Sequence, residues 1–207
     1  MRTRLGLVRS LVFIGVLCVA IASVSPEAVR AAGDQVSFVS ARPIWVADRQ
    51  TEKNLFVGFR AEFDFPTSGR PVLRITASSL YRVYLNGRFV GHGPARGPHG
   101  HCRIDEWPLQ PKAHGRNVLA IEVTGYNANS YYLLDEPTFL QAEVVADGTV
   151  LASTAGAGAD FEATVLPHRV QKVQRYSFQR PFIEYYRLRA GDDRWWERPA
   201  VQSAARS

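Results

Sequence analysis

The chain has 207 residues, of which 46% are hydrophobic, 21% charged and 11% aromatic, and its formal net charge is +6. This length fits one globular domain, and the large apolar share excludes a disordered chain, because enough surface can be buried to offset the entropy of ordering. The 16 Gly and 12 Pro are typical of a turn-rich, all-β fold.

Residues 1–31 have the pattern of a secretory signal peptide. Positions 2–9 carry three Arg and no acidic residue, and Leu11–Val24 is a run of fourteen apolar or small residues. A membrane-spanning helix needs about 20 such residues, so this shorter run is typical of a signal peptide. We favour cleavage after Ala31 over cleavage after Ala22; an uncleaved anchor is the alternative. The sequence therefore predicts a secreted or periplasmic protein with no membrane segment beyond the signal peptide.

Removal of this segment changes the meaning of the charge and of the cysteines. Four Arg and one Glu are lost with it, which leaves about +3 in residues 32–207 and disfavours nucleic acid as a partner. Cys102 is then the remaining cysteine of two, so no intramolecular disulfide is expected and the core must hold the fold. We interpret Cys102 as a buried small hydrophobe, since a nucleophilic cysteine needs a partner base.

β-forming segments alternate with turn signals through residues 32–190. Single strands are predicted at Asn54–Phe65, Val72–Ala77, Asn117–Thr124, Phe161–Leu166 and Phe182–Leu188. The Gly- and Pro-rich stretch Gly91–Gly100 and the small-residue stretch Ala152–Ala159 are predicted to be loops. No long amphipathic helix is visible, so the pattern favours an all-β fold, an antiparallel β-sandwich or jelly roll.

The dipeptides Asn86-Gly87 and Asp147-Gly148 each predict a β-hairpin. Both favour the type I′ turn, because its two central residues need positive φ. The hairpin strands are expected within Tyr81–Val90 and at Phe139–Ala146 and Thr149–Ser153.

Residues 191–207 are predicted to form an irregular tail and a candidate truncation point. This stretch contains the adjacent Trp195 and Trp196 and then becomes polar. Adjacent tryptophans pack on something, either on this domain or on a partner domain that the chain lacks.

Two groups of polar residues suggest chemistry but have simpler interpretations. His99 and His101 offer two metal ligands, yet no third ligand stands at a useful spacing, so we predict no metal site and no cofactor. The acids Asp105–Glu106 and Asp135–Glu136 are adjacent pairs. Neighbours on a strand point to opposite faces, so neither pair by itself can flank a glycosidic bond. A pair formed across the two segments is the open alternative.

The segment Tyr126–Leu134 combines three tyrosines with amide and hydroxyl side chains, directly after a predicted strand. Aromatic faces stack on sugar rings while amides hydrogen-bond their hydroxyls, a mixture that suits carbohydrate. A tightly hydrogen-bonded loop beneath the core is the alternative. The candidate carbohydrate-binding residues are Trp107, Tyr126, Asn127, Asn129, Tyr131 and Arg96.

Two stretches, LYRVYLNGRFVGHGPA at Leu80–Ala95 and RIDEWPLQPKAHGRNVLAIEV at 103–123, resemble the N-terminal β-sandwich of bacterial α-L-rhamnosidases of glycoside hydrolase family 78. The resemblance covers about residues 42–188 and implies a galactose-binding-like jelly roll. In that family the catalytic acid and base lie in a downstream (α/α)6 barrel, which this chain is too short to contain. No catalytic residue can therefore be carried over.

The resemblance implies a non-catalytic module that binds carbohydrate, such as rhamnose- or galactose-containing glycans, or that buttresses a catalytic glycosidase domain. Two alternatives stay open. One is a small stand-alone glycoside hydrolase that uses Asp105, Glu106, Asp135 and Glu136. The other is a truncated remnant without independent activity.

Overall fold

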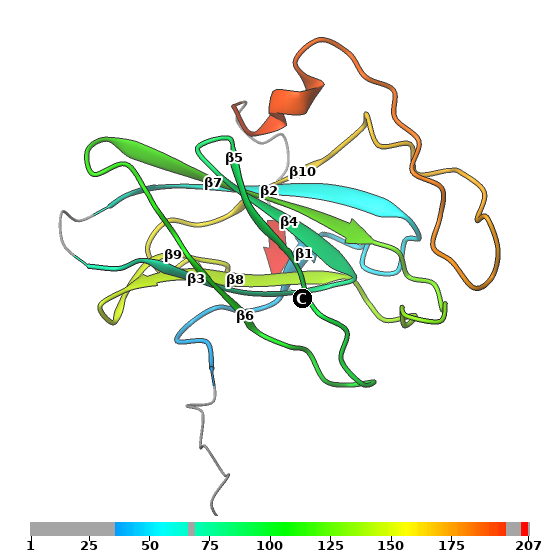
Figure 1. Cartoon of the computed structure of the whole chain (residues 1–207), viewed down its shortest axis with the longest axis horizontal. Coiled ribbons are helices and arrows are strands. Elements are labelled where there is room, and N and C mark those ends of the chain that lie inside the picture. Colours follow the sequence, from blue (N-terminus) through cyan, green and yellow to red (C-terminus); the bar gives the residue numbers. More distant parts are fainter. Residues whose placement is uncertain (1–35, 66–68, 198–203, 207) are drawn as a thin grey trace, which may run out of the picture. The chain divides into compact units, whose positions relative to one another are not determined.

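Two antiparallel sheets pack face to face in the computed structural model, which describes residues 36–65, 69–197 and 204–206 (Figure 1). The first sheet has the strand order β11-β1-β8-β3-β6, with β9 paired to β8, and the second has the order β10-β2-β7-β4-β5. The predicted all-β antiparallel sandwich is confirmed. The strands are β1 Ile44–Val46, β2 Leu55–Asp64, β3 Val72–Ser78, β4 Leu80–Leu85, β5 Arg88–Gly93, β6 Asp105–Pro108, β7 Arg116–Gly125, β8 Phe139–Ala146, β9 Thr149–Ser153, β10 Glu162–Val165 and β11 Ala204–Arg206.

The core lies between the two sheets, and period-two alternation selects the side chains that fill it. On β7, Ile121 and Val123 belong to the core while Glu122 between them points to the opposite face. Trp45 of the first sheet packs against Phe59 of the second, with ring centroids 5.6 Å apart. The domain is therefore held by aromatic and aliphatic burial.

Both predicted hairpins are confirmed, with the expected turn conformation. Asn86 and Gly87 have φ values of 52° and 77°, and Asp147 and Gly148 have 46° and 81°. Positive φ at both central residues defines the type I′ turn. Asn86 also fixes the turn against β7, because its Oδ1 accepts a hydrogen bond from the backbone N–H of Val118 at 3.0 Å.

Residues 167–190, here called the arm, contact the outer face of the second sheet at Glu122 of β7 and Arg82 of β4. The backbone N–H of Leu166 donates to Phe56 O on β2 as the chain enters the arm. Farther along, Arg169 forms an ion pair with Glu122 of β7. This segment is drawn in orange in Figure 1.

The two tryptophans fold back onto this same outer face. They lie on the 3₁₀ helix Asp192–Glu197. A Cβ built on Gly58 of β2 would meet the ring of Trp195 at 2.5 Å, and the ring of Trp196 stacks on Tyr84 of β4 with centroids 5.5 Å apart. The sequence left open whether the two tryptophans pack on this domain or on a partner domain. In the structure they pack on this domain.

Several sequence predictions differ from the structure. Phe182–Leu188 is not a strand; it forms isolated bridges to Arg169 and Arg175 within the arm, because no regular strand runs beside it. β5 extends to Gly93, into the stretch predicted as loop. The tail expected to be irregular contains the 3₁₀ helix and β11, which pairs antiparallel with β1. The signal-peptide prediction lies outside the described residues. Within the described ranges, no helix has the length and apolarity to cross a membrane.

Candidate functional site

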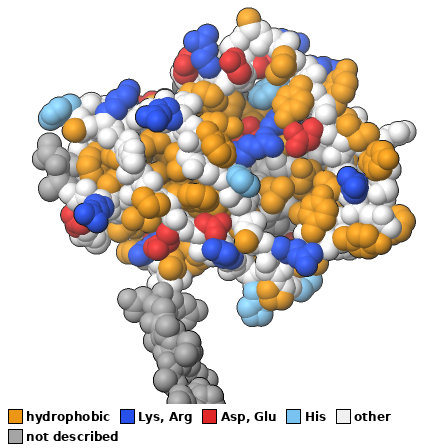
Figure 2. All heavy atoms as spheres, in the orientation of Figure 1, with side chains coloured by type: hydrophobic (Ala, Val, Ile, Leu, Met, Phe, Trp, Pro, Cys, Tyr) orange, Lys and Arg blue, Asp and Glu red, His pale blue; other side chains and the backbone are white. Residues whose placement is uncertain are grey.

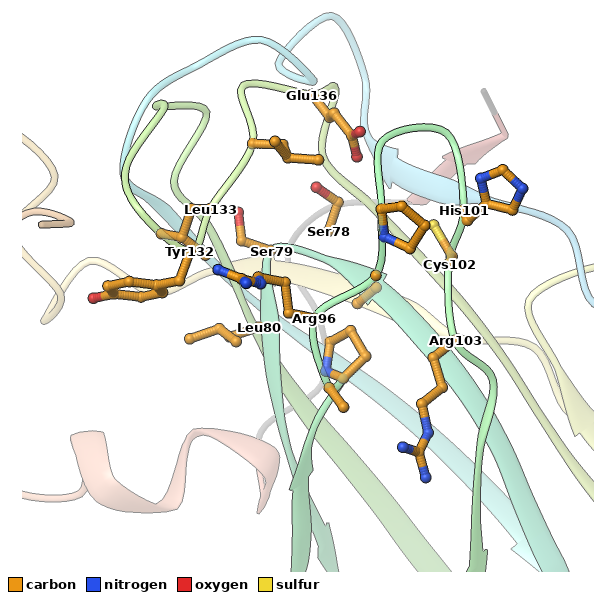
Figure 3. A pocket seen from close by; sticks show the side chains of 16 residues that line it. Ser78, Ser79, Leu80, Arg96, His101, Cys102, Arg103, Tyr132, Leu133 and Glu136 are labelled. Atoms are coloured by element: carbon orange, nitrogen blue, oxygen red, sulfur yellow. The ribbon is translucent and has the colours of Figure 1, made fainter. Parts of the chain in front are cut away.

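Three connections between strands enclose a cleft of about 260 Å³ at one end of the sandwich (Figure 3). They are the turn from β3 to β4, the loop that follows β5, and the connection from β7 to β8. Antiparallel pairing brings them together, because β3, β5 and β7 all end at this edge. The labelled lining residues are Ser78, Ser79, Leu80, Arg96, His101, Cys102, Arg103, Tyr132, Leu133 and Glu136.

Arg96 is the main cationic group of the cleft. Its Nη1 donates a hydrogen bond of 2.7 Å to the backbone carbonyl of Tyr131, which joins the loop after β5 to the connection after β7. In Figure 3 the Arg96 side chain lies beside Tyr132 and Ser79. Arg96 is exposed, and its other N–H groups meet no acceptor among the described residues. They face solvent and can donate to a ligand.

Glu136 supplies a carboxylate at the other end of the cleft, as Figure 3 shows. Its side chain is 25% exposed, and its Oε1 lies 3.8 Å from Nδ1 of His99. A cleft with a guanidinium, a carboxylate, serine hydroxyls and the half-exposed ring of Tyr132 offers donors, acceptors and an apolar face together. This combination is chemically suited to a polyhydroxylated ligand.

Cys102 is exposed on the cleft wall, so its interpretation as a buried residue is wrong. Its thiol is nevertheless partly desolvated. Burial, followed by the negative charge of Glu136, raises the pKa of the Cys102 thiol. The thiol is therefore neutral near pH 7 and a weak nucleophile.

Two of the six candidate residues lie in the interior. Asn127 is 3% exposed, and its Nδ2 donates to the backbone carbonyls of Gln50 and Glu52 and to Oγ1 of Thr138. Tyr126 is 4% exposed and packs edge-on against Phe56, and burial raises its pKa to about 12. Their side chains hold the loop to the core, which matches the alternative of a hydrogen-bonded loop.

Trp107 also has a structural position. It lies half-buried on β6 against the core, and its Nε1 donates to the hydroxyl of Tyr81 at 2.9 Å. A Cβ on Gly91 would meet the Trp107 ring at 2.6 Å, so the indole covers the backbone of β5. The Tyr81 hydroxyl donates in turn to Asp105 at 2.5 Å, and burial raises its pKa.

Asn129, Tyr131 and Arg96 are the candidates that the structure brings together on the surface. Tyr131 is 71% exposed, and its hydroxyl accepts a hydrogen bond from Nε2 of Gln179 in the arm. The backbone carbonyl of Asn129 accepts from Nη2 of Arg175 at 2.6 Å. The connection after β7 is thus fixed between the cleft on one side and the arm on the other.

The acids considered for catalysis are mostly engaged elsewhere. Asp105 is paired with Arg103 and bonded to Tyr81, and Glu106 is paired with Arg74 at 3.0 Å. Glu136 alone of the four lines the cleft. His101 Nδ1 lies 3.2 Å from the carbonyl of His99. Across the described ranges, no group of three or more His, Cys, Asp or Glu is arranged to hold a metal ion.

Sequence reasoning missed Tyr132 as a cleft residue and missed the Ser78–Leu80 turn. The sequence of this turn contains no Gly, Pro, Asn or Asp that would mark it. Its two serines directly follow the β-forming residues of β3, so the sequence does not show where the strand ends. The sequence identifies Glu136 only as a candidate catalytic acid and not as a neighbour of Arg96. Its place opposite Arg96 depends on the pairing of β3 with β8, which the local sequence does not encode.

No protein-family model and no curated protein gives a significant match to the sequence. Among solved structures, the chain is similar to a rhamnosidase of glycoside hydrolase family 78 from Bacillus sp. GL1. The TM-score is 0.68 with 27% identity, and the match covers 83% of this chain but 18% of that one. An α-L-rhamnosidase from Streptomyces avermitilis, solved with L-rhamnose, matches at a TM-score of 0.40 with 16% identity over 60% of this chain and 12% of that one. A lectin from Pleurotus ostreatus, solved with GalNAc, gives 0.44 with 18% identity over 81% and 43%.

Of these three similarities, the one to the rhamnosidase from Bacillus sp. GL1 is informative for this chain. The described sandwich has the fold of a single domain of that rhamnosidase, which confirms the resemblance seen in the sequence. This chain spans less than one fifth of that enzyme's length. The other two matches have TM-scores below 0.5 and do not bear on the ligand.

Proposed function

We propose that this chain is a non-catalytic accessory module of an α-L-rhamnosidase-like glycoside hydrolase system, exported by its N-terminal signal, that binds carbohydrate in the cleft beside Arg96. The observation that carries the proposal is the match of 83% of this chain to 18% of a rhamnosidase. The matched region is a small part of that enzyme, and Asp105 and Glu106 are engaged in ion pairs with Arg103 and Arg74. Both observations favour a carbohydrate-binding function over hydrolysis.

The cleft suits one or two sugar rings. Its volume of about 260 Å³ is near the lower end for small-molecule sites. Arg96 can donate to ring hydroxyls, Glu136 can accept from them, and the ring of Tyr132 offers an apolar face. Rhamnose- and galactose-containing glycans are the ligands we propose, and a catalytic glycosidase domain is the proposed partner.

Calorimetric titration of the purified chain with L-rhamnose, D-galactose and their oligosaccharides tests the proposal. We expect millimolar binding that Arg96→Gln and Glu136→Gln each weaken about tenfold, because each removes a charged hydrogen-bonding group. Arg70→Gln is the matched control, since Arg70 is an exposed arginine outside the residues that line the cleft.

Two results would contradict parts of this function. An absence of heat with every sugar would reject cleft binding and leave the buttressing role, which co-purification with a family 78 catalytic domain can examine. Hydrolysis of an aryl rhamnoside by the chain alone, abolished by Glu136→Gln, would instead establish the stand-alone hydrolase.

A further inference from the structure

Exposed aromatic and large aliphatic side chains gather on the arm and on the adjoining loop. Among the residues that the structure describes, eight of the eleven exposed large hydrophobic residues lie on the arm and on the connection from β7 to β8. Tyr176 and Phe178 are each 76% exposed. Figure 2 shows hydrophobic side chains along the edge where Figure 1 places the arm. The eight residues are Tyr131, Tyr132, Tyr176, Phe178, Ile183, Tyr185, Tyr186 and Leu188.

The same arm carries a cluster of positive charges that are not in ion pairs. Residues 167–190 contain five Arg and one Lys against a single acid, Glu184. Arg169 is buried in an ion pair, but the other five basic residues form no ion pair with any described acidic side chain. Elsewhere on the domain arginines are commonly paired, as in Arg49–Glu52 and Arg74–Glu106. The five unpaired residues are Lys172, Arg175, Arg180, Arg187 and Arg189.

Hydrogen bonds hold this surface in a defined shape. The Arg175 guanidinium donates to the carbonyls of Phe178 and Arg180 and closes the turn at the tip of the arm. Arg180 lies over the ring of Tyr176, with its Cζ 5.9 Å from the centroid. Gln179 bonds the hydroxyl of Tyr131 at 2.8 Å, which fastens the tip to the loop after β7. A preorganised surface loses little entropy when a ligand binds.

We propose that the arm and Tyr131 form a binding surface for an acidic polysaccharide. Its sugar rings stack on exposed aromatic side chains such as Tyr176 and Phe178, and its carboxylates or sulfates pair with Arg180 and Arg187. Unpaired guanidinium groups beside aromatic faces recognise anionic groups and ring faces at once. A neutral glycan would use the aromatic faces but not the charge of the guanidinium groups, whereas an acidic polysaccharide uses both kinds of group.

This inference rests on the proposed carbohydrate role, which is why a polysaccharide is favoured over another polyanion. Single-stranded nucleic acid also pairs stacking with cationic contacts. The net charge of about +3 outside the signal segment is small for a nucleic-acid-binding domain. Nucleic acid therefore enters as a competing outcome of the test.

The test measures binding of a fluorescent oligogalacturonate to the purified chain by anisotropy, with neutral dextran oligomers and a single-stranded oligonucleotide of equal charge as comparisons. We expect oligogalacturonate to bind most tightly. Raising the ionic strength from about 0.02 M to about 0.3 M should weaken its binding strongly, because exposed charges are then screened. Arg180→Gln/Arg187→Gln and Tyr176→Ala/Phe178→Ala should each weaken it about tenfold.

Arg70→Gln/Lys112→Gln is the charge-matched control. These residues are exposed and carry the same two charges, and Lys112 lies next to Asn117 at the far end of β7 from the arm. The control should change the affinity less than twofold, and thermal unfolding verifies that every variant is folded.

Three results would overturn the inference: oligogalacturonate binding no tighter than dextran, equal loss in the control, or equal binding of the oligonucleotide. The cleft is read separately through Arg96→Gln and neutral sugars. Cleft binding without oligogalacturonate binding would reject this inference and leave the proposed function standing. Oligogalacturonate binding without neutral-sugar binding would reject the cleft as a sugar-binding site and leave this inference standing.

Discussion

Arg169 and Glu122 form an ion pair beneath the arm, on the outer face of the second sheet, where both side chains are less than 10% exposed. The Arg169 guanidinium also lies between two rings, with its Cζ 4.7 Å from the centroid of Phe56 and 4.1 Å from that of Tyr186. Its Nη1 reaches Glu184 within the arm at 3.0 Å. One side chain thus joins β2, β7 and both limbs of the arm.

Arg169→Met should lower the free energy of unfolding by about 3 kcal/mol, because it leaves the Glu122 carboxylate buried without its main partner. Urea denaturation measures the loss. Arg187→Met, on the exposed part of the arm, is the control and should change stability by less than about 0.5 kcal/mol. The double variant Glu122→Leu/Arg169→Met should cost less than the two single changes together. Additive losses would mean that the two charges are not coupled.

Gly58→Ala should detach Trp195 from β2. The new methyl group would lie 2.5 Å from the indole ring, and overpacking of this kind costs about 1–3 kcal/mol. Near-ultraviolet circular dichroism and urea denaturation report the displaced ring and the lost stability. Adding Trp195→Ala to Gly58→Ala should remove the steric part of the cost. If Gly58→Ala is as stable as the parent chain, the 3₁₀ helix does not rest on β2 in solution.

Glu52 makes stability depend on pH where the arm meets the β1–β2 connection. Hydrogen bonds from Arg49, then from Gln171 of the arm, lower the pKa of Glu52 from 4.5 to about 2. A carboxyl whose folded pKa is depressed stabilises the fold above its unfolded pKa, and this contribution disappears as the pH falls from 4.5 to 2. The parent chain should therefore exceed Glu52→Gln in stability at pH 6 but match it at pH 2. Since the side chain is 38% exposed, the difference at pH 6 should stay below about 1 kcal/mol. Chemical denaturation at the two pH values measures it, and a constant difference would contradict the assignment.

Cys102 offers a chemical probe of the cleft. Because burial and Glu136 raise its thiol pKa above the usual 9.0, alkylation by iodoacetamide should still accelerate as the pH rises through 9. Saturating sugar should slow the alkylation several-fold, because Cys102 lines the same cleft as Arg96. Peptide mapping by mass spectrometry follows Cys102 separately from Cys18. Unchanged alkylation with bound sugar would place the sugar elsewhere.

The strands of the sandwich could be predicted where side-chain alternation and turn residues agree. Asn86-Gly87 and Asp147-Gly148 define their own hairpins, because few other dipeptides adopt positive φ twice in succession. β1 and β6 were missed, since three or four residues show no period. Phe182–Leu188 has a strand-like composition, but in the structure it finds no regular partner.

The site could be predicted only in part, because exposure is set by tertiary packing. Asn127 and Tyr131 lie four positions apart in one polar-aromatic segment, yet Asn127 is buried and hydrogen-bonded to three neighbouring groups, whereas Tyr131 faces solvent. The composition of this segment does not distinguish a residue that fixes the loop to the core from a residue that faces solvent. The cleft itself arises where three separate connections meet, which needs the strand order rather than any local motif.

β7 has a central place in the domain. It runs between β2 and β4, with the core on one face and Arg169 of the arm against Glu122 on the other. Its amide protons from Leu119 to Thr124 lie between two paired strands, so they reach solvent only when the sheet separates. In deuterium oxide these amides should exchange last, and at the rate of global unfolding, while the amides of the arm exchange through small local openings.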